Sequence, residues 1–143
     1  MDIIVSVNCN YYIFNILQCT NRSIKIGCKL PTNCILKYQI YFSDQNWKNP
    51  NLEKYSKAVE KNKPHIATVI DYDNNVNFNT VLNWANTIAP FVNKVIIIPK
   101  IPGTIKNIPT SIQNKDIILG YSVPSTYGQS EVNIQEFYGR PLS

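Results

Sequence analysis

Acidic side chains follow apolar runs of this sequence. Asp44 comes shortly after the run Gln39–Phe42, and Asp71 and Asp73 come directly after the run Ile66–Ile70. Carboxylates accept hydrogen bonds from N–H groups and can transfer protons, so they suit both binding and catalysis. We therefore take Asp44 and Asp71 as candidate catalytic residues and Asp73 as a candidate binding residue. Each of them could instead cap a helix or support a turn, and two Asn residues after Asp73 favour a turn there.

Aromatic, hydroxyl and basic side chains follow the same runs and two later ones, Val95–Ile98 and Ile117–Leu119. A ring can stack on a planar ligand, and carboxylates beside it can accept hydrogen bonds from the ligand's N–H edge. The side chains therefore predict a pocket for a planar, hydrogen-bonding molecule such as a nucleobase. A Lys after a strand can also be merely solvated. The further candidate binding residues are Trp47, Lys100, Gly120, Tyr121 and Ser122.

Several kinds of site lack the residues they need. The single histidine, His65, precedes its apolar run, so it would lie at the opposite end of a strand from the aspartates, and no nucleophilic triad can be built. Neither a GxGxxG segment nor a Walker A loop occurs. Zinc sites usually use closely spaced ligand pairs, which the four Cys residues do not form. We expect no metal, no cofactor, and reduced, mostly buried thiols. The cysteines are Cys9, Cys19, Cys28 and Cys34.

The elements that would position these residues alternate along the chain. Short runs rich in Ile and Val indicate strands that are buried on both faces, as in parallel sheets. Apolar residues at helical spacing predict helices between them. This alternation predicts an α/β fold with a mainly parallel sheet, in which ligands bind beyond the carboxyl ends of the strands. The predicted strands are Ile3–Val7, Ile24–Cys28, Gln39–Phe42, Ile66–Ile70, Val95–Ile98 and Ile117–Leu119. The predicted helices are Asn10–Gln18, Asn51–Asn62 and Asn79–Val92, with a helical turn around Thr110–Gln113.

Composition limits the class of protein. The chain has 143 residues, of which 44% are hydrophobic and 16% charged, so it can fill the core of one domain over residues 1–143, with a less regular tail over about 124–143. No apolar run approaches the roughly 18–20 residues needed to span a bilayer, and the first residues carry no basic segment typical of a signal peptide. We therefore expect a cytoplasmic protein. The net charge of +5 permits binding to a polyanion, although scattered lysines equally fit a solvated surface.

Several blocks, in their order, resemble the tRNA-guanine transglycosylase superfamily, including shorter phage and mobile-element relatives of its deazaguanine-inserting members. The blocks run from about residue 38 to the end of the chain. The resemblance implies a (β/α)8 barrel of a base-exchange glycosyltransferase, which replaces guanine with a 7-deazaguanine base in nucleic acid. The blocks are YFSDQNW (41–47), KPHIATVIDYD (63–73), IAPFVNKVIIIPKIPGTIKNIP (88–109), LGYSVPSTYG (119–128) and EFYGRP (136–141).

The resemblance also implies roles for individual residues. Asp44 matches the Asp of the family's Asp-Ser-Gly-Gly-Phe-Gln block, with Gln45-Asn46 in place of Ser-Gly. Asp71 matches the Asp that binds the heterocycle, and Gly120-Tyr121-Ser122-Val123 resembles a Gly-Gly segment that lines the base pocket. Lys100 stands near a position where the family often has Gln.

The family's nucleophilic Asp and its zinc module would lie beyond Ser143, so the resemblance implies the base-recognising part of the enzyme. A complete barrel takes roughly 250 residues, and this length would supply about five or six of its strands. Exposed sheet edges favour aggregation, so we expect the chain to form an open sheet, to pair with another copy, or to dock on a second subunit. The alternatives are a non-catalytic viral or mobile-element module that binds nucleic acid or a partner chain, and a purely structural subunit.

Overall fold

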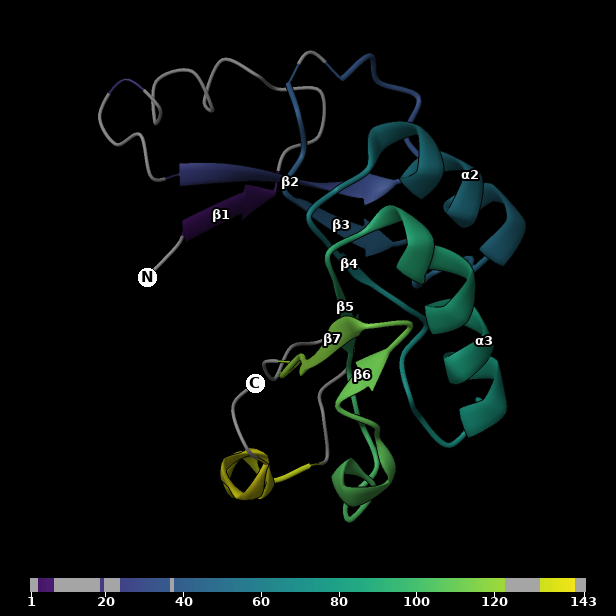
Figure 1. Ribbon diagram of the computed structural model, residues 1–143, viewed down its shortest axis with the longest axis vertical. Helices are drawn as coiled ribbons and strands as arrows, with labels where there is room; N and C mark the ends of the chain where they lie inside the picture. Colours follow the sequence, from purple (N-terminus) through teal and green to yellow (C-terminus); the bar gives the residue numbers. More distant parts are fainter. Residues whose placement is uncertain (1–2, 7–18, 20–23, 37, 123–131, 141–143) are drawn as a thin grey trace.

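The computed structural model describes residues 3–6, 19, 24–36, 38–122 and 132–140. Within these residues seven strands form one sheet in the order β1-β2-β3-β4-β5-β7-β6 (Figure 1). All neighbouring strands run parallel except β6, which is antiparallel to β7 at the edge of the sheet. The predicted α/β fold with a mainly parallel sheet is thereby confirmed. The strands are β1 (Ile3–Ser6), β2 (Ile24–Leu30), β3 (Phe42–Gln45), β4 (Ile66–Thr68), β5 (Lys94–Ile97), β6 (Ser111–Ile112) and β7 (Lys115–Leu119).

Two α-helices connect β3 to β4 and β4 to β5, and both cover the same face of the sheet (Figure 1). Helix α2 (Leu52–Asn62) begins where the side chain of Asn51 accepts a hydrogen bond from the Lys54 N–H, and Asn77 caps helix α3 (Phe78–Ile88) in a similar way. Both predicted helices are present, and α2 ends at the predicted Asn62. No helix in the described part of the chain is long and apolar enough to cross a membrane.

Helix α3 ends earlier than the predicted Val92, because Pro90 cannot donate the next helical hydrogen bond. The chain continues as a 3₁₀ helix, η1 (Ala89–Phe91). The carbonyl of Asn86, which the N–H of residue 90 would otherwise satisfy, instead accepts a hydrogen bond of 3.0 Å from the Gln113 side chain. A side chain from the distant β6–β7 turn therefore completes the end of this helix.

The core lies between the sheet and the two helices. Alternate residues of β2, among them Ile26 and Leu30, are buried in one cluster with Val59 of α2 and Val81 of α3. The residues between them point to the opposite side of the sheet, because successive side chains of a strand alternate. We call the side of the sheet away from α2 and α3 the second face. Its described residues include Lys29 of β2.

The third strand does not lie where the hydrophobic pattern predicts it. The expected strand Gln39–Phe42 is too early, and the strand runs over Phe42–Gln45. Ser43 and Gln45 are polar but almost fully buried, so this strand lacks the apolar run by which its neighbours are recognised. Asp44 is therefore part of the strand and does not lie in the loop that follows it.

The helical turn expected around Thr110–Gln113 is also wrong. Ser111–Ile112 form strand β6, which turns into β7 through Gln113 and Asn114. Both turn residues have positive φ angles, 49° and 62°, as a tight two-residue β-hairpin requires. Two further 3₁₀ helices are present, η2 (Ile105–Asn107) and, in the tail, η3 (Ile134–Gly139). The predicted helix Asn10–Gln18 lies outside the described residues.

The expectation of reduced thiols holds for only part of the described cysteines. Cys19 and Cys28 are free, whereas Cys34 is disulfide-bonded. The spacing of the cysteines gave no indication of this bond, because a disulfide depends on the distance between two residues in the fold. Cys28 is buried in the core cluster, and burial raises the pKa of its thiol, so it behaves as a small apolar residue.

Candidate functional site

Four charged residues from neighbouring strands lie at the carboxyl edge of the sheet. The β2–β3 register places Lys29 opposite Asp44, and the loops after β4 and β5 supply Asp71 and Lys100. The signs of the charges run positive, negative, negative, positive across the four strands. We call these residues the charged row: Lys29, Asp44, Asp71 and Lys100.

Asp71 and Lys100 come together because the parallel pairing of β4 and β5 continues past the ends of the two strands. Tyr72 and Pro99 form an isolated parallel bridge, and the N–H of Lys100 donates to the carbonyl of Tyr72 at 2.9 Å. The Lys100 ammonium lies 2.8 Å from the Asp71 carboxylate, and about a quarter or less of each side chain is exposed. The ion pair is therefore partly shielded from water and holds Asp71 at a fixed place on the edge.

Asp44 is held by a hydroxyl from the next strand. The Thr68 hydroxyl accepts a hydrogen bond of 3.0 Å from the N–H of Gln45 and donates its single proton to the Asp44 carboxylate at 2.8 Å. Burial raises the pKa of Asp44, the nearby negative charge of Asp71 raises it further, and the hydrogen bond from Thr68 lowers it. The site thus combines one carboxylate paired with a lysine and one carboxyl that takes up a proton more readily than usual.

Helix α2 supports these strands from behind. The hydroxyl of Tyr55, a residue that is almost fully buried, donates to the carbonyl of Thr68 at 2.8 Å and lies 3.0 Å from the hydroxyl of Ser43. Burial raises the pKa of Tyr55, so the hydroxyl stays protonated and remains a donor. Tyr55 therefore fixes the helix to the two strands whose opposite face carries Asp44 and Thr68.

Close packing fills the second face below the charged row. A side chain added at Gly27 would lie 2.9 Å from the ring of Phe42, and one added at Gly120 would lie 2.7 Å from Ile98. Both distances are shorter than carbon atoms tolerate, so these positions require glycine. Gly120, predicted to bind a base, has a packing role that accounts for its residue type, and its N–H donates to the carbonyl of Ile97.

The remaining predicted binding residues have differing surroundings. Trp47 follows β3 and is 44% exposed, with the Lys48 ammonium 5.3 Å from its ring centre. The Asp73 carboxylate accepts the N–H of Asn75 at 2.8 Å, as expected for an aspartate that supports a turn. Tyr121 follows β7, next to β5, and packs edge-on against Phe137 of η3.

Ser122 follows Tyr121 at the same edge of the sheet. His65 lies just before β4, at the opposite edge, and stacks on Tyr41 with ring centres 4.7 Å apart. No group of three or more potential metal-ligating side chains occurs in the described part of the chain.

Two residues of the site were not predicted. Lys29 lies inside an apolar strand, where its alternation with Ile26, Cys28 and Leu30 marks a position on the second face, and this pattern was available in the sequence. Thr68 reads as an ordinary β-branched strand residue, because nothing in the sequence shows that its hydroxyl lies beside Asp44.

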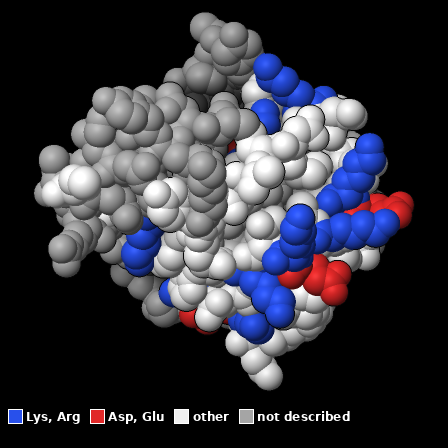
Figure 2. Space-filling model, turned by 90° about the horizontal axis from the view of Figure 1, so that it is seen from above, with Lys and Arg blue, Asp and Glu red and all other residues white. Residues whose placement is uncertain are grey.

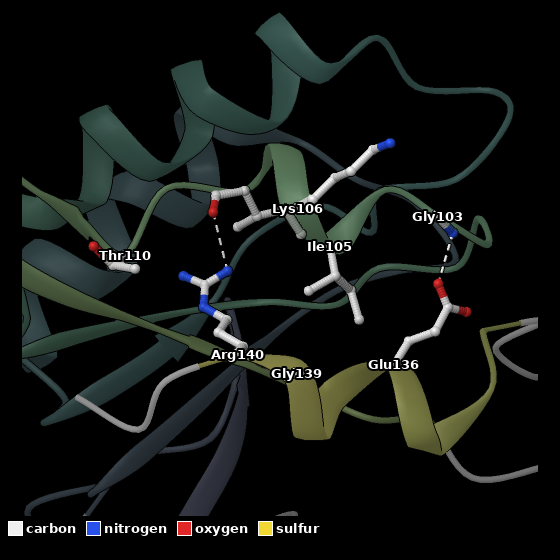
Figure 3. A pocket seen from close by; sticks show the side chains of 8 residues that line it. Gly103, Ile105, Lys106, Thr110, Glu136, Gly139 and Arg140 are labelled. Carbon is white, nitrogen blue, oxygen red and sulfur yellow. Dashed lines mark hydrogen bonds between the residues drawn. The ribbon is translucent and has the colours of Figure 1, made fainter.

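A separate cavity of about 420 Å³ lies between η2 and η3 (Figure 3). Glu136 and Arg140 reach toward the β5–β6 connection from opposite ends of η3. The Glu136 carboxylate accepts the N–H of Gly103 at 2.8 Å, and the Arg140 guanidinium donates to the carbonyls of Ile108 and Pro109. These charged groups are bound to backbone, so they fasten η3 to the rest of the fold, and the charged row is the better candidate for a ligand site.

Comparisons with known proteins give a match to a protein family. No curated protein and no solved structure matches the chain. A model of one protein family, described as a family of unknown function (DUF6610), matches residues 26–142. The matched region contains every residue of the charged row, and Thr68 and Tyr55 as well. The chain therefore belongs to the DUF6610 family.

Proposed function

We propose that the charged row binds a planar nitrogen heterocycle of the guanine or 7-deazaguanine type. The observation that carries this proposal is the approach of Asp44 and Asp71 on adjacent strands, close enough for the charge of Asp71 to raise the pKa of Asp44. Two carboxyl groups that differ in how readily they take up a proton suit a base edge that offers both donors and acceptors. The resemblance of the ordered sequence blocks to the tRNA-guanine transglycosylase superfamily favours the same class of ligand.

The two carboxyl groups take different roles in this proposal. Asp71, paired with Lys100, accepts hydrogen bonds from N–H groups of the base. Asp44, whose raised pKa favours uptake of a proton, donates to a ring nitrogen or carbonyl oxygen and can return that proton. Trp47, in the loop after β3, is 44% exposed and would stack on the base in this proposal.

The proposal extends to the architecture. Parallel strands in consecutive order, with the connecting helices on one face, are the arrangement from which a (β/α)8 barrel is built. We propose that β1 to β5 and β7 correspond to a partial barrel of this kind, with the charged row at its carboxyl edge, where the ligand sites of such barrels lie.

Titration calorimetry with guanine and with 7-deazaguanine tests the proposal. Asp71→Asn keeps the size of the side chain but removes the charge, and it should weaken binding by about 10-fold or more, since a hydrogen bond to a charged group contributes about 1.5–3 kcal/mol. Asp116→Asn is the matched control, because Asp116 lies near the amino end of β7, away from the charged row. No binding by the wild type, or equal binding by the Asp71 variant, would refute the proposal.

A second candidate function, binding to nucleic acid without base recognition, is favoured by the net charge of +5. Figure 2 shows several basic side chains close together on the part of the surface that is not drawn grey, with acidic side chains among them. Phosphate-driven binding weakens steeply with salt. Mobility-shift assays with DNA and RNA at low and high salt test it, and the absence of salt-sensitive binding would exclude it.

A further inference from the structure

The side chain that follows Asp44 on β3 has an unusual environment. Gln45 points to the helix side of the sheet, opposite to Asp44, and only 2% of it is exposed. Its carboxamide oxygen is buried and has no hydrogen-bond partner among the residues that the structure describes. Leaving a buried acceptor unpaired costs about 1–3 kcal/mol, so folded proteins usually provide a partner. Something outside the described protein atoms is expected to donate to this oxygen.

Gln45 lines a cavity of about 140 Å³ at the amino end of helix α2. Polar residues line part of the cavity: the cap residue Asn51, Asn46 and Asn49 of the β3–α2 loop, and Lys54 of the first turn of the helix. The rest of its lining is formed by Leu30, Pro31, Tyr55 and Trp84. The described lining carries no acidic side chain. The positive end of the helix dipole, the ammonium of Lys54 and the amide groups all favour an anion.

We propose that this cavity binds a phosphate group, and that Gln45 accepts a hydrogen bond from the protonated oxygen of that phosphate. A phosphate with a proton satisfies both parts of the site: its other oxygens accept from the loop amides and from Lys54, and its P–OH donates to the otherwise unpaired oxygen of Gln45. The inference stands independently of the base site, because Gln45 and the charged row lie on opposite faces of the sheet.

The size of the cavity limits the ligand. Its volume equals that of about five water molecules in the liquid. That is room for a tetrahedral oxyanion of five heavy atoms, and too little for a nucleoside. The ligand is therefore free phosphate, or the singly protonated form of a phosphomonoester whose remaining part lies outside the cavity.

Titration of the whole chain with inorganic phosphate at neutral pH tests the site. Gln45→Met preserves the length of the side chain and removes the amide, and it should lower phosphate affinity at least tenfold. Lys54→Gln, at an exposed position that does not endanger folding, should lower it about fivefold. Lys57→Gln removes an identical charge one turn further along α2, where the lysine is paired with Glu53 at 2.9 Å, and should leave the affinity unchanged.

Sulfate distinguishes this site from a simple attraction between an anion and a helix end. Sulfate carries no proton at neutral pH, so it should bind at least tenfold more weakly than phosphate. Equal affinity for the two anions, no phosphate binding by the wild type, or equal losses in the Lys54 and Lys57 variants would each overturn the proposal.

Guanosine monophosphate separates the two sources of phosphate. Affinity equal to that of inorganic phosphate identifies free phosphate as the ligand and supports the site as stated. Tighter binding of guanosine monophosphate than of inorganic phosphate supports a phosphomonoester whose remaining part lies outside the cavity. If inorganic phosphate binds while guanine does not, the base site fails and the phosphate site stands.

Discussion

Thr68 of β4 bonds to Asp44 of the neighbouring strand β3, and replacing Thr68 by Val tests whether this bond holds the Asp44 carboxylate. Val has nearly the same shape as Thr but lacks the hydroxyl. The change removes the 2.8 Å hydrogen bond to the Asp44 carboxylate and the 3.0 Å bond from the Gln45 N–H. It also leaves that N–H buried without its partner.

The expected loss of stability follows from these two contacts. A hydrogen bond to a charged acceptor contributes about 1.5–3 kcal/mol, and a buried N–H that loses its partner costs about 1–3 kcal/mol. With partial relaxation we expect the free energy of unfolding to fall by about 3 kcal/mol at pH 7. An unfolding entropy of about 2.1 cal/mol/K per residue over the 143 residues converts this loss to a Tm about 10 °C lower.

The effect should also depend on pH. The hydrogen bond from Thr68 lowers the pKa of Asp44, so the variant raises that pKa still further above its ordinary value. The folded variant therefore binds a proton more readily than the folded wild type, and the difference in stability shrinks as the pH falls and Asp44 becomes neutral. Urea denaturation at pH 7 and pH 4 measures both values.

Thr80→Val, at an exposed position of α3, is the control and should change stability by less than about 0.5 kcal/mol. A loss below about 1 kcal/mol for the Thr68 variant at pH 7, or an equal loss at both pH values, would show that Thr68 does not hold an ionised Asp44.

Three further changes test neighbouring parts of the structure. Asp44→Asn should raise stability at pH 7, because the raised pKa means that the folded state disfavours the ionised carboxyl; thermal melts should show this gain disappearing as the pH falls below the ordinary pKa of Asp. Tyr55→Phe should cost about 1–3 kcal/mol in urea denaturation, since Ser43 and the Thr68 carbonyl lose a buried partner, and a neutral result would contradict that role. Lys63→Gly should add about 0.5–1 kcal/mol, because Lys63 ends α2 with a φ of 44°, which glycine adopts without strain; an unchanged melting temperature would count against this.

Hydrophobic patterns predicted the elements that bury apolar side chains. Helix α2 was predictable from Tyr55 and Val59 at helical spacing. Strand β3 was misplaced because its core-facing residues, Ser43 and Gln45, are polar. Ser43 and Gln45 are buried because helix α2 packs over them, where Ser43 bonds to Tyr55 and Gln45 faces the cavity at the start of the helix. Such contacts join segments distant in the sequence, so a local pattern of residues does not reveal them.

The part of the site that was predictable from the sequence is the part that the order and direction of the strands determine. Asp44, Asp71 and Lys100 follow from the rule that the carboxyl ends of parallel strands share an edge. Their grouping needed no knowledge of side-chain geometry. The role of Thr68 could not be predicted, because it depends on the register between β3 and β4 and on the direction of one hydroxyl.

The short antiparallel strand β6 has a consequence for how this fold can be extended. Each parallel strand from β1 to β5 lies next to the one before it, and β7 continues the series, so a further parallel strand would pair with the outer edge of β7. The β6 hairpin already occupies that edge at the amino end of β7, where Ser111 pairs with Asp116. Among the described residues, the outer edge of β1 carries no such hairpin, so a duplicated strand–helix unit or a strand from a second chain could lengthen the parallel series there. The β6 hairpin therefore makes the two edges of the sheet differ. The β7 edge is partly covered by an antiparallel strand, and the β1 edge is the one at which a further parallel strand could pair.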